Sequence, residues 1–102
     1  MPDSPQKPTI LIVEDEVGPR NALKVILRPF YNLQSVDNGH AALRAIKEEH
    51  IDLITLDMKL PDRHGMDLLQ AIRAERDDVE VIIITGDGCR PLWSRRISAQ
   101  TL

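Results

Sequence analysis

A short apolar run that ends in a single carboxylate constrains the fold of this chain most. Residues 53–56 are apolar apart from one threonine, Asp57 follows directly, and Pro61 and Gly65 come soon after. A run of this length before turn-forming residues predicts a buried strand that leads into a loop. Asp57 is therefore expected at the carboxyl end of a strand, the edge of an open α/β sheet where ligands bind.

The same pattern recurs along the chain, with amphipathic segments between the apolar runs. Helical spacing of apolar residues predicts three helices, which begin near Pro19, Gly39 and Gly65. Apolar and β-branched runs predict four strands, at residues 9–13, 31–36, 51–56 and 81–84. Strands and helices in alternation indicate parallel strands joined by right-handed crossovers.

Composition narrows the range of functions. A length of 102 residues suits one small domain, and a net charge of -3 argues against nucleic acid as the main partner. No apolar stretch approaches the roughly 20 residues that span a bilayer. Cys89 is the one cysteine, so no internal disulfide forms and a reducing cytoplasm is the expected setting. Residues 1–8 are expected to be a disordered lead-in and not a signal peptide.

Polar side chains stand where three of the predicted strands end. Glu14 and Asp15 follow the first strand, Asp57 closes the third, and Thr85 closes the fourth. An acidic first turn of the next helix is the plainer explanation for the acids at 14–16. If the first and third strands are neighbours, however, Glu14, Asp15 and Asp57 gather into one cluster. Such carboxylates repel one another, and Mg²⁺ would relieve the repulsion.

These pieces together resemble the receiver domain of bacterial two-component response regulators. The resemblance rests on residues 10–16, on residues 52–61 with Gly65, and on residues 81–86, and it covers residues 9–86. It implies a flavodoxin-like α/β fold with three layers and a parallel sheet in the strand order 2-1-3-4. It also implies a cytoplasmic phosphoacceptor signalling domain that is not an enzyme.

The resemblance assigns a role to each residue of the cluster. Asp57 receives a phosphoryl group from a histidine kinase or a phosphotransfer protein, and Thr85 supplies the switch hydroxyl. The implied ligands of Mg²⁺ are Glu14, Asp15, Asp57 and the main-chain carbonyl of Met58.

The sequence departs from that family after Gly86. The family continues with a fourth helix, a fifth strand ending in Lys-Pro and a fifth helix, and residues 87–102 match none of them. The family's lysine after the fifth strand therefore has no equivalent here, since Lys59 lies in the acceptor loop. The tail is divergent, and its sequence allows a helix from about Pro91 with Trp93 and Ile97 on one face.

Two other functions stay open on the sequence alone. One is a truncated receiver that mainly self-associates or docks to another protein, with weak or no phosphorylation. The other is an aspartate-nucleophile phosphohydrolase, which is disfavoured because Lys59, and not an acid, stands two residues after Asp57.

An apolar fourth strand without a neighbour leaves an open sheet edge that invites pairing. We expect a homodimer that associates near this strand and buries Trp93; cover by the chain's own tail is the alternative. Binding to DNA or to a membrane is not expected.

Overall fold

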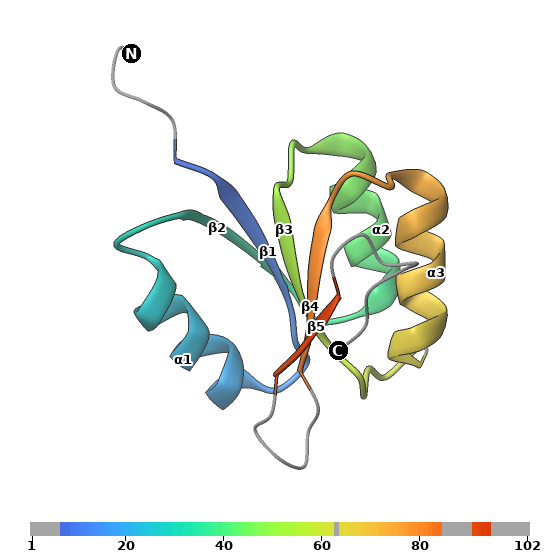
Figure 1. Ribbon diagram of the computed structural model, residues 1–102. Helices are drawn as coiled ribbons and strands as arrows, with labels where there is room; N and C mark the ends of the chain where they lie inside the picture. The colour runs from blue at the N-terminus through green and yellow to red at the C-terminus, as the bar shows by residue number, and fades with distance from the viewer. Residues whose placement is uncertain (1–6, 63, 85–90, 95–102) are drawn as a thin grey trace.

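Strands and helices alternate along the chain and build one sheet between two helical layers (Figure 1). The computed structural model describes residues 7–62, 64–84 and 91–94. The elements in these residues are β1 (Thr9–Val13), α1 (Val17–Leu27), β2 (Asn32–Val36), α2 (Gly39–Glu48), β3 (Leu53–Asp57), α3 (Gly65–Glu75), β4 (Glu80–Ile84) and β5 (Pro91–Ser94). None of the described helices has the length and apolarity that a membrane crossing requires.

The first four strands are parallel, and the sheet has the order β2-β1-β3-β4-β5. The predicted order 2-1-3-4 and the predicted parallel direction are thus confirmed. β1 lies between β2 and β3, with Val13 in register with Leu56. The residues that follow β1 and β3 therefore emerge side by side at one edge of the sheet.

A fifth strand, which the sequence did not predict, pairs with the outer edge of β4. β5 runs antiparallel to β4, with Pro91 opposite Ile84 and Ser94 opposite Val81. Residues 91–94 are thus a strand and not the start of the helix that the tail sequence allowed. The physical reason is the edge of β4, whose unpaired main-chain groups a neighbouring extended segment can satisfy. Ile97 and the rest of residues 95–102 lie outside the described part of the chain.

The main hydrophobic core lies between the sheet and the layer of α2 and α3. Alternate residues of the inner strands point into it, as the two-residue repeat of a strand requires. Leu11 and Val13 come from β1, and the helices add side chains such as Ile46 and Ile72. The buried cluster consists of Leu11, Val13, Ala42, Ile46, Ile51, Ile54, Leu56, Leu68, Leu69, Ile72, Val79, Val81 and Ile83.

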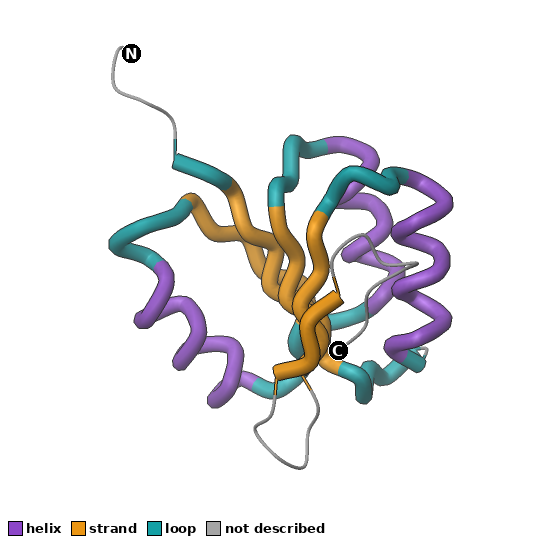
Figure 2. The backbone as a smooth tube through the Cα atoms, in the orientation of Figure 1, coloured by secondary structure: helices purple, strands orange, loops and turns teal. Residues whose placement is uncertain are grey.

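The opposite face of the sheet carries α1 as the one helix among the described elements (Figure 2). The apolar residues of α1 recur at helical spacing, as predicted, yet none of its residues is buried. Leu23 and Leu27 are only half-buried. The expected apolar face of this helix is therefore present but incompletely covered.

Candidate metal centre and phosphoacceptor site

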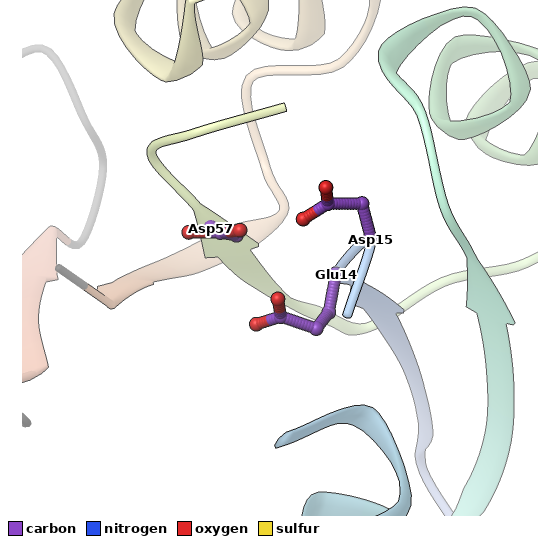
Figure 3. A group of neighbouring side chains, drawn as sticks. All are labelled: Glu14, Asp15 and Asp57. Carbon is purple, nitrogen blue, oxygen red and sulfur yellow. The ribbon is translucent and has the colours of Figure 1, made fainter. Parts of the chain in front are cut away.

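Three carboxylates meet at the carboxyl end of the sheet (Figure 3). Glu14 and Asp15 follow β1, and Asp57 is the last residue of the neighbouring strand β3. Each side chain has a carboxylate oxygen within 4.8 Å of an oxygen of the other two. The parallel pairing of β1 with β3 brings them together across more than forty residues of sequence, as the predicted strand order requires.

Burial makes this cluster electrostatically costly. Glu14 is 7% exposed and Asp57 is 8% exposed, whereas Asp15 is exposed. Burial, followed by the negative charges of Asp57 and Asp15, raises the pKa of the Glu14 carboxyl from 4.5 to about 7. The main-chain N–H of Glu16 opposes this shift, since it donates to a Glu14 carboxylate oxygen at 3.2 Å. The cluster thus binds a proton more readily than separate carboxylates would.

The cluster has the composition of a site for a hard divalent cation. Mg²⁺ prefers carboxylate oxygens and keeps several of its waters. Two of the three acids are buried and one is exposed, so the group faces both protein and solvent. Burial is the main reason that the pKa of Glu14 is raised, and a cation would offset the negative charges of Asp57 and Asp15, which raise it further. The residues present therefore fit Mg²⁺.

One main-chain N–H of the following loop bonds the Asp57 side chain, and a second main-chain bond closes the loop against α3. The N–H of Lys59 donates to Oδ1 of Asp57 at 3.2 Å, and the N–H of Gly65 donates to the carbonyl of Met58 at 3.1 Å. Position 65 has no room for a side chain, because a Cβ atom there would lie 2.7 Å from the Cα atom of Met58. Glycine at 65 thus lets α3 begin directly against the acceptor strand.

Asp62 links the same loop to the start of α2 through hydrogen bonds, a role that the sequence did not predict. Its carboxylate accepts hydrogen bonds from the main-chain N–H groups of Gly39 at 2.8 Å and His40 at 3.0 Å. Asn38 caps the same helix end by accepting from the N–H of Ala41 at 2.8 Å. The turn at 37–39 signals the Asn38 cap, but no local pattern links Asp62 to a helix 22 residues earlier in the chain.

The remaining candidates separate into those that the structure places and those that it does not. Thr85 lies outside the described residues. Lys59 is exposed, and the histidines at 50 and 64 have partners away from the acids. His50 contacts Asp52 at 3.0 Å, and His64 accepts from the N–H of Met66 at 3.1 Å at the start of α3. The described part of the site therefore consists of the three carboxylates and the loop that holds Asp57.

A family model described as the response regulator receiver domain matches residues 10–100. The chain belongs to this family. The match accounts for both the fold and the position of the acidic cluster, and it defines the chain as a signalling domain of two-component systems.

Curated relatives place the chain among several kinds of regulator. Sporulation initiation phosphotransferase F of Bacillus subtilis is 36% identical over 80 residues, which are 78% of this chain and 64% of that protein. Chemotaxis protein CheY-3 of Vibrio cholerae is 36% identical over 85 residues, 79% of this chain and 65% of that protein. The probable transcriptional regulatory protein TcrX of Mycobacterium tuberculosis is 31% identical, and the chain spans 35% of its length.

Solved structures give the same result. A receiver domain protein described as CheY-like from Methanospirillum hungatei has a TM-score of 0.77 at 30% identity, covering 79% of this chain and 66% of that one. The response regulator protein TrrA from Thermotoga maritima, in complex with Mg²⁺ and BeF, has a TM-score of 0.75 at 30% identity. The alignment with TrrA covers 79% of this chain and 71% of that chain.

Proposed function

We propose that Asp57 accepts a phosphoryl group from a histidine kinase or a phosphotransfer protein, in a reaction that depends on Mg²⁺. The observation that carries this proposal is the cluster of Glu14, Asp15 and Asp57 at the ends of two adjacent parallel strands. Among the relatives, one is named a phosphotransferase, and one solved neighbour holds Mg²⁺ with BeF. Both support a site for a cation and a phosphoryl group.

The chemistry follows from the placement of Asp57. A carboxylate oxygen of Asp57 forms a bond to phosphorus while the phosphorus–nitrogen bond to the donor histidine breaks, and the imidazole nitrogen keeps the electron pair. The Lys59 N–H engages Oδ1, so the other oxygen, Oδ2, is the one we assign as nucleophile. A bound Mg²⁺ would supply positive charge that offsets the charges of the acids and of the phosphoryl oxygens.

Glu14, Asp15 and Asp57 are the side chains that would hold the cation. The Met58 carbonyl, proposed from the resemblance as a further ligand, already accepts from the N–H of Gly65 and so would bind through its second lone pair. The next carbonyl along the loop, that of Lys59, is the alternative. From the same resemblance we propose that the hydroxyl of Thr85 contacts the phosphoryl group.

We further propose a cytoplasmic setting, where kinase and receiver would meet, and a role without direct binding to nucleic acid. The single cysteine and the net charge of -3 support these two points. The resemblance would place a lysine beside the phosphoryl group, and no lysine follows Lys59 in this sequence. We therefore expect phosphorylation of Asp57 to be slow.

Labelling with a small phosphodonor tests the proposal. Radiolabelled acetyl phosphate with Mg²⁺ should label the wild-type chain slowly, and EDTA or Asp57→Asn should abolish the label. Asp52→Asn is the matched control, because Asp52 directly precedes the same strand at its opposite end. A chain that takes no label over hours, or that is labelled equally in Asp57→Asn, would contradict the proposal.

A further inference from the structure

The main-chain carbonyl of Glu14 lies where the sheet no longer supplies a donor. Glu14 directly follows β1, and its N–H donates to the carbonyl of Val36 at 3.1 Å. The next donor of this parallel ladder would come from a residue after Val36, where β2 has ended. No main-chain N–H of the described residues donates to the Glu14 carbonyl. Because Glu14 is only 7% exposed, its carbonyl needs another partner.

The side chain of Arg20 supplies the missing donor. Its Nη1 donates to the Glu14 carbonyl at 3.0 Å, in a contact that is partly buried. Arg20 belongs to the first turn of α1, and helical side chains lean towards the amino end of their helix, here towards the turn after β1. A hydrogen bond from a guanidinium is charge-assisted and stronger than a neutral one. Arg20 thus links the first turn of α1 to the end of β1.

The segment that this bond holds carries two of the three clustered acids. Arg20 binds the peptide group that joins Glu14 to Asp15, and the N–H of Glu16 donates to the Glu14 carboxylate at 3.2 Å. Asp15 is exposed, so packing does little to fix its direction. In the described part of the chain, Arg20 is the one side chain from another segment that hydrogen-bonds to the main chain of residues 14–16. The orientation of both acids therefore depends on Arg20.

The other basic residues on this flank of α1 make no such bond. Lys24 and Arg28 follow Arg20 at intervals of four residues and face β2 as it does. Neither side chain forms a hydrogen bond or an ion pair with another described residue. The bond to Glu14 thus belongs to position 20 and not to the basic flank as a whole. This difference provides a matched control on the same helix.

We propose that Arg20 is a positioning residue for the cation site, and that its hydrogen bond fixes how Glu14 and Asp15 present their carboxylates to Mg²⁺. The inference rests on the proposed function, because it concerns the Mg²⁺ that phosphorylation of Asp57 would use. Arg20 has two opposing effects on this cation. Its positive charge disfavours a second cation nearby, whereas its hydrogen bond orders the ligands. The ordering is the larger effect.

Mg²⁺ titrations of the full chain, followed by amide NMR without a phosphodonor, test the proposal. Arg20→Gln should weaken Mg²⁺ binding about tenfold, as the loss of a residue that orients metal ligands usually does. Loss of the positive charge alone would tighten binding instead, so the direction of the change separates the two effects. Arg20→Lys keeps a donor and should recover part of the affinity. Arg28→Gln removes the same charge from the same flank and should not weaken binding.

A second measurement does not require the cation. Without Mg²⁺, the amide hydrogen of Glu16 should exchange with solvent roughly threefold faster, or more, in Arg20→Gln than in the wild type, because the segment is less ordered. Arg28→Gln should leave this rate unchanged. The amide spectra also show whether each variant is folded.

The outcomes separate this proposal from the function on which it rests. A wild type that binds Mg²⁺ and an Arg20→Gln variant that binds it equally or more tightly would overturn the positioning role alone. An unchanged exchange rate at Glu16 would overturn it as well. A wild type that does not bind Mg²⁺ would contradict the cation dependence of the proposed function, and the role of Arg20 with it.

Discussion

The two faces of the sheet differ in how completely they are covered. On one face, α2 and α3 enclose a continuous core that includes Leu56 and Ile72, both fully buried. On the other face, α1 has no buried residue and borders an apolar groove. The acidic cluster lies at the edge where these faces meet. The comparison teaches that the phosphoacceptor edge is built on the covered face, whereas α1, as far as the described residues show, covers the other face only in part.

A pair of truncations in β3 gives the largest expected effect. Ile54 points into the core and Leu53, its neighbour, lines the groove. Ile54→Ala should lower the free energy of unfolding by about 2–5 kcal/mol, the usual cost of a cavity in a packed core. Leu53→Ala should cost about 1 kcal/mol, because its surroundings are open. Urea unfolding at low protein concentration measures both, and equal losses would show that the groove face is covered.

Asp62 links the acceptor loop to the covered face. Asp62→Ala removes two hydrogen bonds to the amino end of α2 and a charge that favours this helix end. We expect a loss of about 1–2 kcal/mol in thermal unfolding. Asn38→Ala, which removes the other cap of the same helix, is the control. If Asp62 also positions the loop, Asp62→Ala should slow the phosphoryl labelling of Asp57, and Asn38→Ala should not. Equal labelling of the two variants would show that Asp62 contributes to stability alone.

Thr55 lies on the face of the sheet that carries α1, and its replacement is expected to stabilise the chain. Because its buried hydroxyl lacks a partner among the described residues, Thr55→Val should raise the free energy of unfolding by about 1 kcal/mol. A stabilised variant at low protein concentration would confirm that the hydroxyl is unsatisfied in the monomer. Destabilisation would instead indicate a partner for this hydroxyl, such as an ordered water.

The pH dependence of stability tests the charge balance of the cluster. In the folded chain the pKa of Glu14 is raised from 4.5 to about 7, so the folded state binds its proton more tightly than the unfolded state does. The Glu14 carboxyl therefore stabilises the folded chain at pH values below its ordinary pKa of 4.5, and this contribution is lost as the pH rises towards 7. The slope is at most about 1.4 kcal/mol per pH unit for one proton.

Thermal unfolding without divalent cations measures this effect as a difference between the wild type and Glu14→Gln. The wild type should lose stability relative to the variant as the pH rises from about 4.5 to about 7. Saturating Mg²⁺ should restore the wild type at the upper end of this range. Parallel pH profiles for the two proteins would show that the pKa of Glu14 is the same in the folded and the unfolded chain.

Much of this arrangement follows from sequence alone, and the rest depends on contacts that sequence does not encode locally. Apolar runs and their alternation with helices predict the four parallel strands and hence the meeting of Glu14 with Asp57. The antiparallel strand at residues 91–94 forms because the edge of β4 lies beside it, a contact that the sequence of the segment does not indicate. The hydrogen bonds of Asp62 join the acceptor loop to the start of α2, and no local sequence pattern links these two segments. The exposure of α1 depends on what else covers the sheet, which the amphipathic pattern of the helix leaves open.

Fluorine NMR of beryllofluoride, which mimics a phosphoryl group on a carboxylate, tests the central claim most directly. With Mg²⁺ and the wild-type chain, we predict bound fluoride resonances that disappear on addition of EDTA and are absent in Asp57→Asn. The Asp52→Asn variant should bind like the wild type. The absence of bound resonances in the wild type at millimolar beryllofluoride and Mg²⁺, or identical resonances in Asp57→Asn, would contradict Asp57 as the phosphoryl acceptor.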